Sequence, residues 1–130
     1  MRALVTGACG FIGANLTKKL VSLGWTVDAV DNLSGGTIES LEGLNIRHLP
    51  NASFIEHFNR NLESNNKSRG SDEVLLIIDD LASPDMLAYV NSGNYDVVFH
   101  QAAVPRVSYS VEQPWHTTDV NISKTVRLFE

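Results

Sequence analysis

Cysteine is almost absent from this chain, because Cys9 is the only one among 130 residues. A disulfide within the chain is therefore excluded, which suits a reducing compartment such as the cytoplasm. The sequence also has no apolar run near the roughly 18 residues that a membrane-spanning helix needs. The opening residues, MRALVTG, lack the apolar core of a secretory signal. Together these absences predict a cytoplasmic location and no membrane partner.

Positive charge is scarce as well. Ten Lys and Arg residues stand against fifteen Asp and Glu residues, which gives a net charge of −5. Because nucleic acids and anionic lipids are polyanions, this balance disfavours general binding to either of them. We therefore expect no nucleic-acid partner. The length fits a single domain and is too short for a dinucleotide-binding domain together with a substrate domain.

Apolar, β-rich runs alternate with helical patterns along the chain. The runs predict four buried strands, at Arg2–Thr6, Trp25–Asp31, Glu73–Asp79 and Tyr95–Ala102. Helical spacing of apolar residues follows the first run, Ser83 and Pro84 predict the start of another helix, and Pro114–Glu130 predicts a last one. The polar stretch Asn59–Asp72 has no periodicity and predicts an exposed loop. Strands that alternate with helices are typical of an α/β fold with a parallel sheet.

Glycine is concentrated where the first predicted strand meets the first helix, at Gly7, Gly10 and Gly13. Glycine inside an element costs about 0.5–1 kcal/mol relative to alanine, so this placement needs a reason. A glycine turn at that point lets the backbone approach a pyrophosphate and directs the helix N-terminus at its charge. A tight turn without a ligand is the alternative. The other phosphate loop, G-x-x-x-x-G-K-[ST], is absent, which disfavours a nucleoside triphosphatase.

An acidic residue completes this pattern. Asp31 ends the second predicted strand, 24 positions after Gly7. A carboxylate there can accept hydrogen bonds from both ribose hydroxyls of an adenosine and would repel a 2′-phosphate, so NAD is favoured over NADP. An Asx turn that opens the stretch DNLSGG is a second interpretation, and the two roles can coexist. The fold class that follows is α/β: the N-terminal half of a Rossmann-like, doubly wound parallel sheet in the strand order 3-2-1-4.

Four stretches of the chain resemble the extended short-chain dehydrogenase/reductase family, in particular its NAD-dependent nucleotide-sugar epimerases and dehydratases. They are VTGACGFIGANL, VDNLSGG, FHQAAVPRVSYSVEQP and DVNISKTVRLFE. The resemblance covers most of the chain apart from about His48 to Asp72. It implies that NAD is the cofactor and that a nucleotide sugar, above all a UDP-sugar, is the small-molecule partner.

The resemblance also implies roles for particular residues. Amides of the glycine turn would face the pyrophosphate, the residues after the second and third strands would hold the adenosine, and those after the fourth would pass the second ribose. The residues that it assigns to the cofactor are Gly7, Gly10, Phe11, Ile12, Gly13, Asp31, Asn32, Ser34, Asp80, Leu81, Gln101, Ala102, Ala103 and Asn121. Those that it places beside the substrate are Val104, Arg106 and Ser110.

Several of these roles have plainer alternatives. Asp79 and Asp80 fit a solvated loop as well as an adenine site, and Arg106 fits an ordinary surface arginine. For His100 we favour a strand-end residue that orders a loop, since the sequence shows no evident partner for it. Neither the pattern nor the resemblance predicts a metal site.

The chain departs from the family where the chemistry should be. In the family that this chain resembles, a Tyr-x-x-x-Lys pair carries the acid/base chemistry. Four residues after the three tyrosines of this chain stand Gly93, Phe99 and Gln113, so no such pair exists. Ser123 and Lys124 also replace the usual Asn-Gly. We therefore expect residues 1–130 to be an incomplete NAD-binding Rossmann domain without catalytic residues or a substrate domain.

Two functions fit these observations. The first is the NAD-binding part of a nucleotide-sugar epimerase, which is an isomerase, or of a dehydratase. In the full-length enzyme, NAD would transiently oxidise a sugar hydroxyl. The alternative is a stand-alone, non-catalytic dinucleotide-binding module. A remnant that binds nothing is disfavoured because the glycines and Asp31 are intact. A homo-oligomer is also expected, because the Tyr95–Ala102 strand would lie on an open sheet edge.

Overall fold

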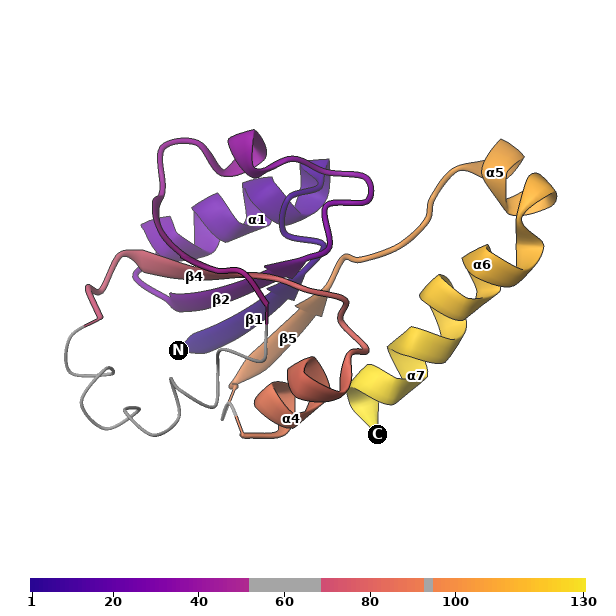
Figure 1. The fold of residues 1–130 in the computed structure, drawn as a ribbon. Coiled ribbons are helices and arrows are strands. Elements are labelled where there is room, and N and C mark those ends of the chain that lie inside the picture. The colour runs from indigo at the N-terminus through magenta and orange to yellow at the C-terminus, as the bar shows by residue number, and fades with distance from the viewer. Residues whose placement is uncertain (52–68, 93–94) are drawn as a thin grey trace.

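The computed structural model of the chain describes residues 1–51, 69–92 and 95–130. Five parallel strands form one sheet in the spatial order β3-β4-β2-β1-β5 (Figure 1). The strands are β1 (Arg2–Thr6), β2 (Thr26–Asp31), β3 (Asn45–Leu49), β4 (Glu73–Ile78) and β5 (Val97–His100). The carboxyl ends of β1, β2, β4 and β5 therefore meet at one edge of the sheet, where α/β proteins bind their ligands.

The predicted strand order is confirmed for the four strands that the sequence indicated. Those four are β1, β2, β4 and β5, and they lie in the order β4-β2-β1-β5, which is the expected 3-2-1-4. The prediction missed β3, which adds a fifth strand beside β4 and pairs from Asn45 with Glu73 to Leu49 with Ile77. The sequence NIRHL has only two apolar residues, and burial along this edge strand is partial.

The core lies on both faces of the sheet, because successive strand residues point to opposite sides. On one face, Val5 and Leu76 pack with Ala14 and Leu20 of α1 (Phe11–Ser22). On the other face, Leu4 and Ile77 pack with Met86 and Tyr89 of α4 (Pro84–Ser92). Figure 1 shows these two helices on opposite sides of the sheet. The central strands are buried almost continuously, as expected of a parallel sheet that is covered on both faces.

The helix boundaries have local causes. α1 ends just before Gly24, whose φ of 77° allows the chain to turn. A 3-10 turn, η1 (Ile38–Leu41), follows β2. At the start of α4, the Met86 amide donates to Ser83 Oγ at 3.1 Å, which confirms Ser83 as the N-cap.

The C-terminal region is helical, with more breaks than the single predicted helix. It contains α5 (Val107–Glu112), α6 (Pro114–Thr118), a π-helical turn (Asp119–Ser123) and α7 (Lys124–Phe129). The sequence did not indicate α5. Figure 1 shows that this arm leaves the β5 side of the sheet and that only its last part, α7, returns toward α4.

The remaining features are the lengths of the helices and the predicted loop before β4. Among residues 1–51, 69–92 and 95–130, no helix is both long and apolar enough to cross a membrane. Most of the predicted loop Asn59–Asp72 lies outside the described residues. The prediction of exposure is wrong for Arg69, which forms an ion pair with the buried Asp28 at 2.6 Å.

Candidate functional site

A cavity of about 710 Å³ lies at the carboxyl edge of the sheet. It is bordered by the glycine turn, by the segments that follow β2, β4 and β5, and by the helical arm near Asn121. All fourteen residues predicted for the cofactor line it, although they come from five separate stretches of the chain. Of the three residues predicted for the substrate, Val104 lines the cavity. Arg106, the N-cap of α5 (Val107–Glu112), and Ser110, within α5, lie outside the lining.

The glycine turn brings strand, helix and cavity together. Gly7 has a φ of 64°, and a Cβ there would lie 2.7 Å from the Ala102 amide nitrogen. A Cβ on Gly13 would lie 2.1 Å from the Gly7 carbonyl oxygen, so the close contact of α1 with the end of β1 requires glycine. At Gly10 the nearest atom to such a Cβ is 3.3 Å away. These surroundings match a turn, an open approach for a ligand, and a close packing contact.

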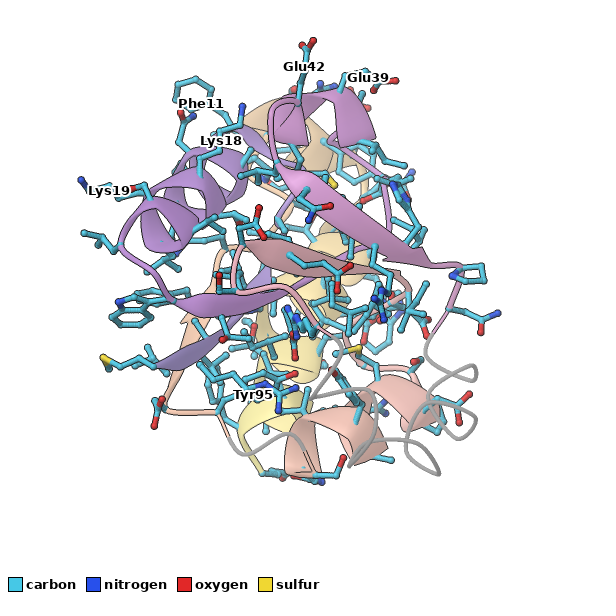
Figure 2. The ribbon with its side chains drawn as sticks, turned by 90° about the vertical axis from the view of Figure 1, so that its left-hand side faces the viewer. Phe11, Lys18, Lys19, Glu39, Glu42 and Tyr95 are labelled. Carbon is cyan, nitrogen blue, oxygen red and sulfur yellow. The ribbon has the colours of Figure 1, made fainter. Side chains whose placement is uncertain are left out.

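The first turn of α1 is open to an anion. Gly10 is its N-cap, and the structure shows neither a side-chain cap nor an acidic residue in the first turn. The first amides of a helix are unsatisfied unless a cap or a ligand accepts from them, and the helix dipole favours negative charge there. The Phe11 side chain is 85% exposed and points away from the body of the protein (Figure 2). Phe11 and Ile12 therefore offer the site their backbone amides.

Asp31 connects the glycine turn with the loop after β2. Its Oδ2 accepts from the Cys9 amide at 2.8 Å, and its Oδ1 accepts from the Leu33 amide at 2.7 Å. The second bond is the predicted Asx turn. The Cys9 contact was not visible from the sequence, because it joins residues 22 positions apart. Each carboxylate oxygen can accept more than one hydrogen bond, so Asp31 can still accept from ribose hydroxyls.

The segment after β4 is ordered by Asp80. Asp80 Oδ1 accepts from the Ala82 amide at 2.9 Å, and Oδ2 forms an ion pair with Lys124 from the start of α7. Burial alone would raise the pKa of Asp80, but the hydrogen bonds from Lys124 and Ala82 hold it below its usual value. The Asp80 carboxylate is therefore held at the cavity by Lys124 and the Ala82 amide. Sequence reasoning missed Lys124 as a cavity residue, although the lysine in place of the usual glycine was the available signal.

His100 has two partners that were not evident from the sequence. Its Nδ1 lies 2.7 Å from Thr6 Oγ1, and its Nε2 lies 2.9 Å from Thr125 Oγ1. Thr6 Oγ1 already accepts from the amides of Gln101 and Ala102, so we assign its proton to the bond with Nδ1. Nε2–H then donates to Thr125. Burial lowers the pKa of His100, in line with a neutral ring that orders the segment after β5.

Asn121 braces the same segment from the π-helical turn. Its Oδ1 accepts from the Val104 amide at 2.8 Å, and its Nδ2 donates to the Val104 carbonyl at 3.1 Å. Both backbone groups of one residue are thus satisfied by a single side chain. This contact braces the segment after β5 and fixes the path of the chain past the cavity.

The Cys9 thiol does not add chemistry to this cavity. The Cys9 thiol is buried, and burial together with the neighbouring Asp31 raises its pKa to about 12, so it stays protonated and unreactive at neutral pH. Across the described part of the chain, no group of three or more His, Cys, Asp or Glu side chains is placed to hold a metal ion.

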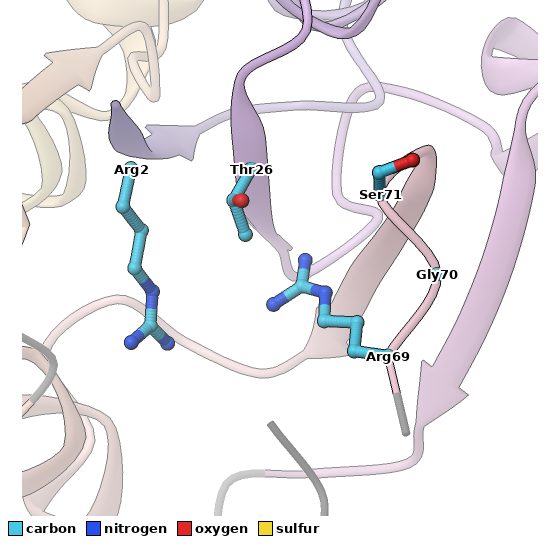
Figure 3. A pocket seen from close by; sticks show the side chains of 5 residues that line it. All are labelled: Arg2, Thr26, Arg69, Gly70 and Ser71. Carbon is cyan, nitrogen blue, oxygen red and sulfur yellow. The ribbon is translucent and has the colours of Figure 1, made fainter. Parts of the chain in front are cut away.

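A second hollow, of about 300 Å³, lies near the amino ends of the strands (Figure 3). Figure 3 shows Arg2 and Arg69 on either side of Thr26. Both guanidinium groups are engaged by Asp28, at 2.7 Å and 2.6 Å respectively. We therefore assign this hollow to the structural core of the protein rather than to the cofactor cavity.

Comparison with known proteins gives a consistent result. Residues 3–130 match the NAD dependent epimerase/dehydratase family. UDP-glucose 4-epimerase from Mycolicibacterium smegmatis is 32% identical over 130 residues, which are all of this chain and 34% of that protein. A putative UDP-glucose 4-epimerase from Methanocaldococcus jannaschii is 28% identical over 98% of this chain and 32% of its own length. The chain thus spans about a third of the length of these relatives.

Solved structures agree with the sequence relatives. UDP-glucose 4-epimerase from Thermotoga maritima with UDP-glucose superposes with a TM-score of 0.70 at 27% identity, over 98% of this chain and 32% of that one. The Thermus thermophilus UDP-glucose 4-epimerase complex with NAD gives a TM-score of 0.67 at 28% identity, with the same coverage of 98% and 32%.

Proposed function

This chain belongs to the NAD dependent epimerase/dehydratase family, and from that membership we propose that its 130 residues form the NAD-binding part of a nucleotide-sugar epimerase. The observation that carries the proposal is the convergence of all fourteen expected cofactor residues on one cavity. A cytoplasmic location belongs to the same proposal, since the single cysteine suits a reducing compartment.

The residues around the cavity suit the successive parts of NAD. The free amides at the start of α1 would take the diphosphate, and Asp31 would accept from the adenosine ribose. Asp80 and the buried Leu81 would edge the adenine, while Gln101 to Ala103 would lie along the second ribose. When bound, NAD supplies the hydride acceptor for oxidation of a sugar hydroxyl.

The substrate that we propose is a UDP-sugar. Support comes from relatives named as UDP-glucose 4-epimerases and from the Thermotoga maritima structure with UDP-glucose. Val104 lies at the cavity and would meet the sugar nucleotide first. Arg106 and Ser110 would join only in the complete substrate site, because they stand outside the cavity of this chain.

A stand-alone, non-catalytic binding module remains the second candidate, because it would use the same cavity. The coding sequence downstream of Glu130 distinguishes the two candidate functions. An open reading frame with a Ser and a Tyr-x-x-x-Lys pair supports the epimerase, and a stop codon supports the module.

Calorimetric titration of the chain with NAD and NADP tests the proposal. We expect tighter binding of NAD, and Asp31→Ala should weaken it by roughly 1–3 kcal/mol because ribose hydroxyls lose their acceptor. Asp31 also holds the Cys9 and Leu33 amides, so urea unfolding of the variant must accompany the titration. Glu42→Ala, at an exposed position away from the cavity, is the matched control. Equal affinity for the two cofactors in the unmutated chain contradicts the proposal.

A further inference from the structure

Among the described residues that line the cofactor cavity, Lys124 is the only lysine or arginine. It is the first residue of α7, directly after the π-helical turn. Its ammonium group reaches Asp80 Oδ2 in the segment after β4, 44 positions away in sequence. With 20% of its side chain exposed, Lys124 is largely sheltered by the cavity.

The charges in the cavity show why a lysine there matters. Asp31, Asp79 and Asp80 line the cavity together with Lys124, so carboxylates outnumber its lysines and arginines three to one. A dinucleotide would bring a diphosphate with two more negative charges. The start of α1 offers backbone amides and a partial positive charge. The lining also holds two histidines, His116 and His100, and burial lowers the pKa of His100. Lys124 is therefore the one lysine or arginine of the described lining that can offset the carboxylates and a diphosphate.

The ion pair with Asp80 suits a lysine that is held in readiness. The lysine side chain is long and flexible, and fixing it costs conformational entropy when a ligand binds. The ion pair with Asp80 lowers that cost, because it already holds the ammonium group inside the cavity before a ligand binds. Asp80 is itself fixed by the Ala82 amide, so the pair has a defined position. A cation that is already placed gains more from an arriving anion than a mobile one does.

We propose that Lys124 is a cofactor-positioning residue of this chain, whose ammonium group supplies the countercharge for the diphosphate of the bound dinucleotide. This inference rests on the proposed function. It makes Asp80 the residue that holds Lys124 in place before the cofactor arrives. It also gives α7 a direct part in cofactor binding, beyond the brace that Asn121 provides.

Titration calorimetry with NAD, ADP-ribose and adenosine separates a phosphate contact from an effect on the adenine. Lys124→Met keeps the length of the side chain and removes its charge. We expect it to bind NAD and ADP-ribose about tenfold more weakly, because a charge-assisted contact is lost. Adenosine, which has no diphosphate, should lose much less affinity. Lys124→Arg should recover most of the affinity. Removing a countercharge should also make NAD binding less sensitive to salt.

Lys19→Met is the matched control, because it removes the same charge from the protein. Lys19 is exposed on the outer side of α1 (Figure 2). Unfolding midpoints of all variants show whether the fold is intact. NAD affinity that is unchanged in Lys124→Met overturns the inference, as does an equal loss for adenosine that Asp80→Asn reproduces. Absence of NAD binding by the unmutated chain overturns the proposed function itself.

Discussion

Gly35 and Gly36 are neighbours in the loop after β2, yet their surroundings differ completely. A Cβ on Gly36 would lie 2.3 Å from the Cys9 carbonyl oxygen and 2.8 Å from the Gly10 amide nitrogen. A Cβ on Gly35 would meet no atom within 4 Å. The loop thus contacts the glycine turn directly at Gly36 and is open to solvent at Gly35.

We expect Gly36→Ala to lower the free energy of unfolding by about 1–3 kcal/mol, because backbone must move to admit the methyl group. It should also weaken NAD binding, since the displaced backbone belongs to the glycine turn. Gly35→Ala, the matched control, should be neutral or slightly stabilising. Urea unfolding followed by NAD titration measures both effects. Equal stability of the two variants would mean that the contact between loop and turn is not as tight as described.

At the residue scale, spacing was enough to find the side chains of the candidate site but not their partners. Gly10 and Asp31 could be picked out because a strand, a glycine turn and a second strand follow one another within about 30 residues. The Lys124–Asp80 pair and the two threonines around His100 depend on how distant segments fold together. Such contacts leave no local pattern, so the sequence showed no evident partner for His100.

At the element scale, one buried carboxylate connects most of the sheet with α4. The Asp28 side chain has no exposed surface, and it accepts from Arg2 of β1, Arg69 before β4, Tyr89 of α4 and Tyr95 before β5. Burial alone would raise the pKa of Asp28, but the guanidinium groups of Arg69 and Arg2 and the hydroxyl of Tyr95 hold it below its usual value. The cluster is therefore built around a charged carboxylate.

This shift predicts how stability depends on pH. A carboxyl whose pKa is lowered by folding stabilises the protein above its unfolded value, 3.8, and that contribution is lost as pH falls below it. Asp28→Asn should lower the free energy of unfolding by about 3–5 kcal/mol at pH 7, because it leaves buried guanidinium groups without a charged partner. The difference from the unmutated chain should shrink below about pH 4.

Urea unfolding between pH 3 and pH 7 measures this dependence. Asp85→Asn, on the exposed first turn of α4, serves as the control for the loss of one carboxylate. A difference between Asp28→Asn and the unmutated chain that stays constant across the range would show that folding does not lower the pKa of Asp28.

The same scale shows which elements a sequence can specify. Strands β1, β2, β4 and β5 are short apolar runs that lie between turns, and all four were predicted. β3 was missed because its strand character depends on pairing with β4 rather than on its own residues. Arg69 was assigned to an exposed loop because its neighbours are polar, and only the fold brings it to Asp28. Long-range pairing decided both cases.

At the scale of the whole molecule, one side of the protein is left uncovered. Among the described strands, β5 pairs only with β1 and forms an edge of the sheet. The adjacent arm exposes large apolar side chains, among them Val111 at 76%, Trp115 at 79% and Phe129 at 59%. An open strand edge beside apolar surface favours association. We expect a dimer or a larger species in size-exclusion chromatography with light scattering, and Trp115→Lys should shift it toward monomer. A monomeric unmutated chain at high concentration would contradict this expectation.

The distribution of acid/base groups leads to the last prediction, that these 130 residues alone do not turn over a UDP-sugar at a rate typical of the family. Oxidation of a sugar hydroxyl needs a base to take the proton as the hydride leaves. Tyr89 and Tyr95 donate to Asp28 near the opposite end of the sheet, and burial raises their pKa values. His100 is held between two threonine hydroxyls. Loss of a positioned base costs typically about 10²–10⁴-fold in rate, and lost orientation of the substrate can cost more. An epimerase assay with NAD and several UDP-sugars, run beside a full-length UDP-glucose 4-epimerase, measures this, and turnover by a monomer of this chain would show that it contains a base that we have not identified.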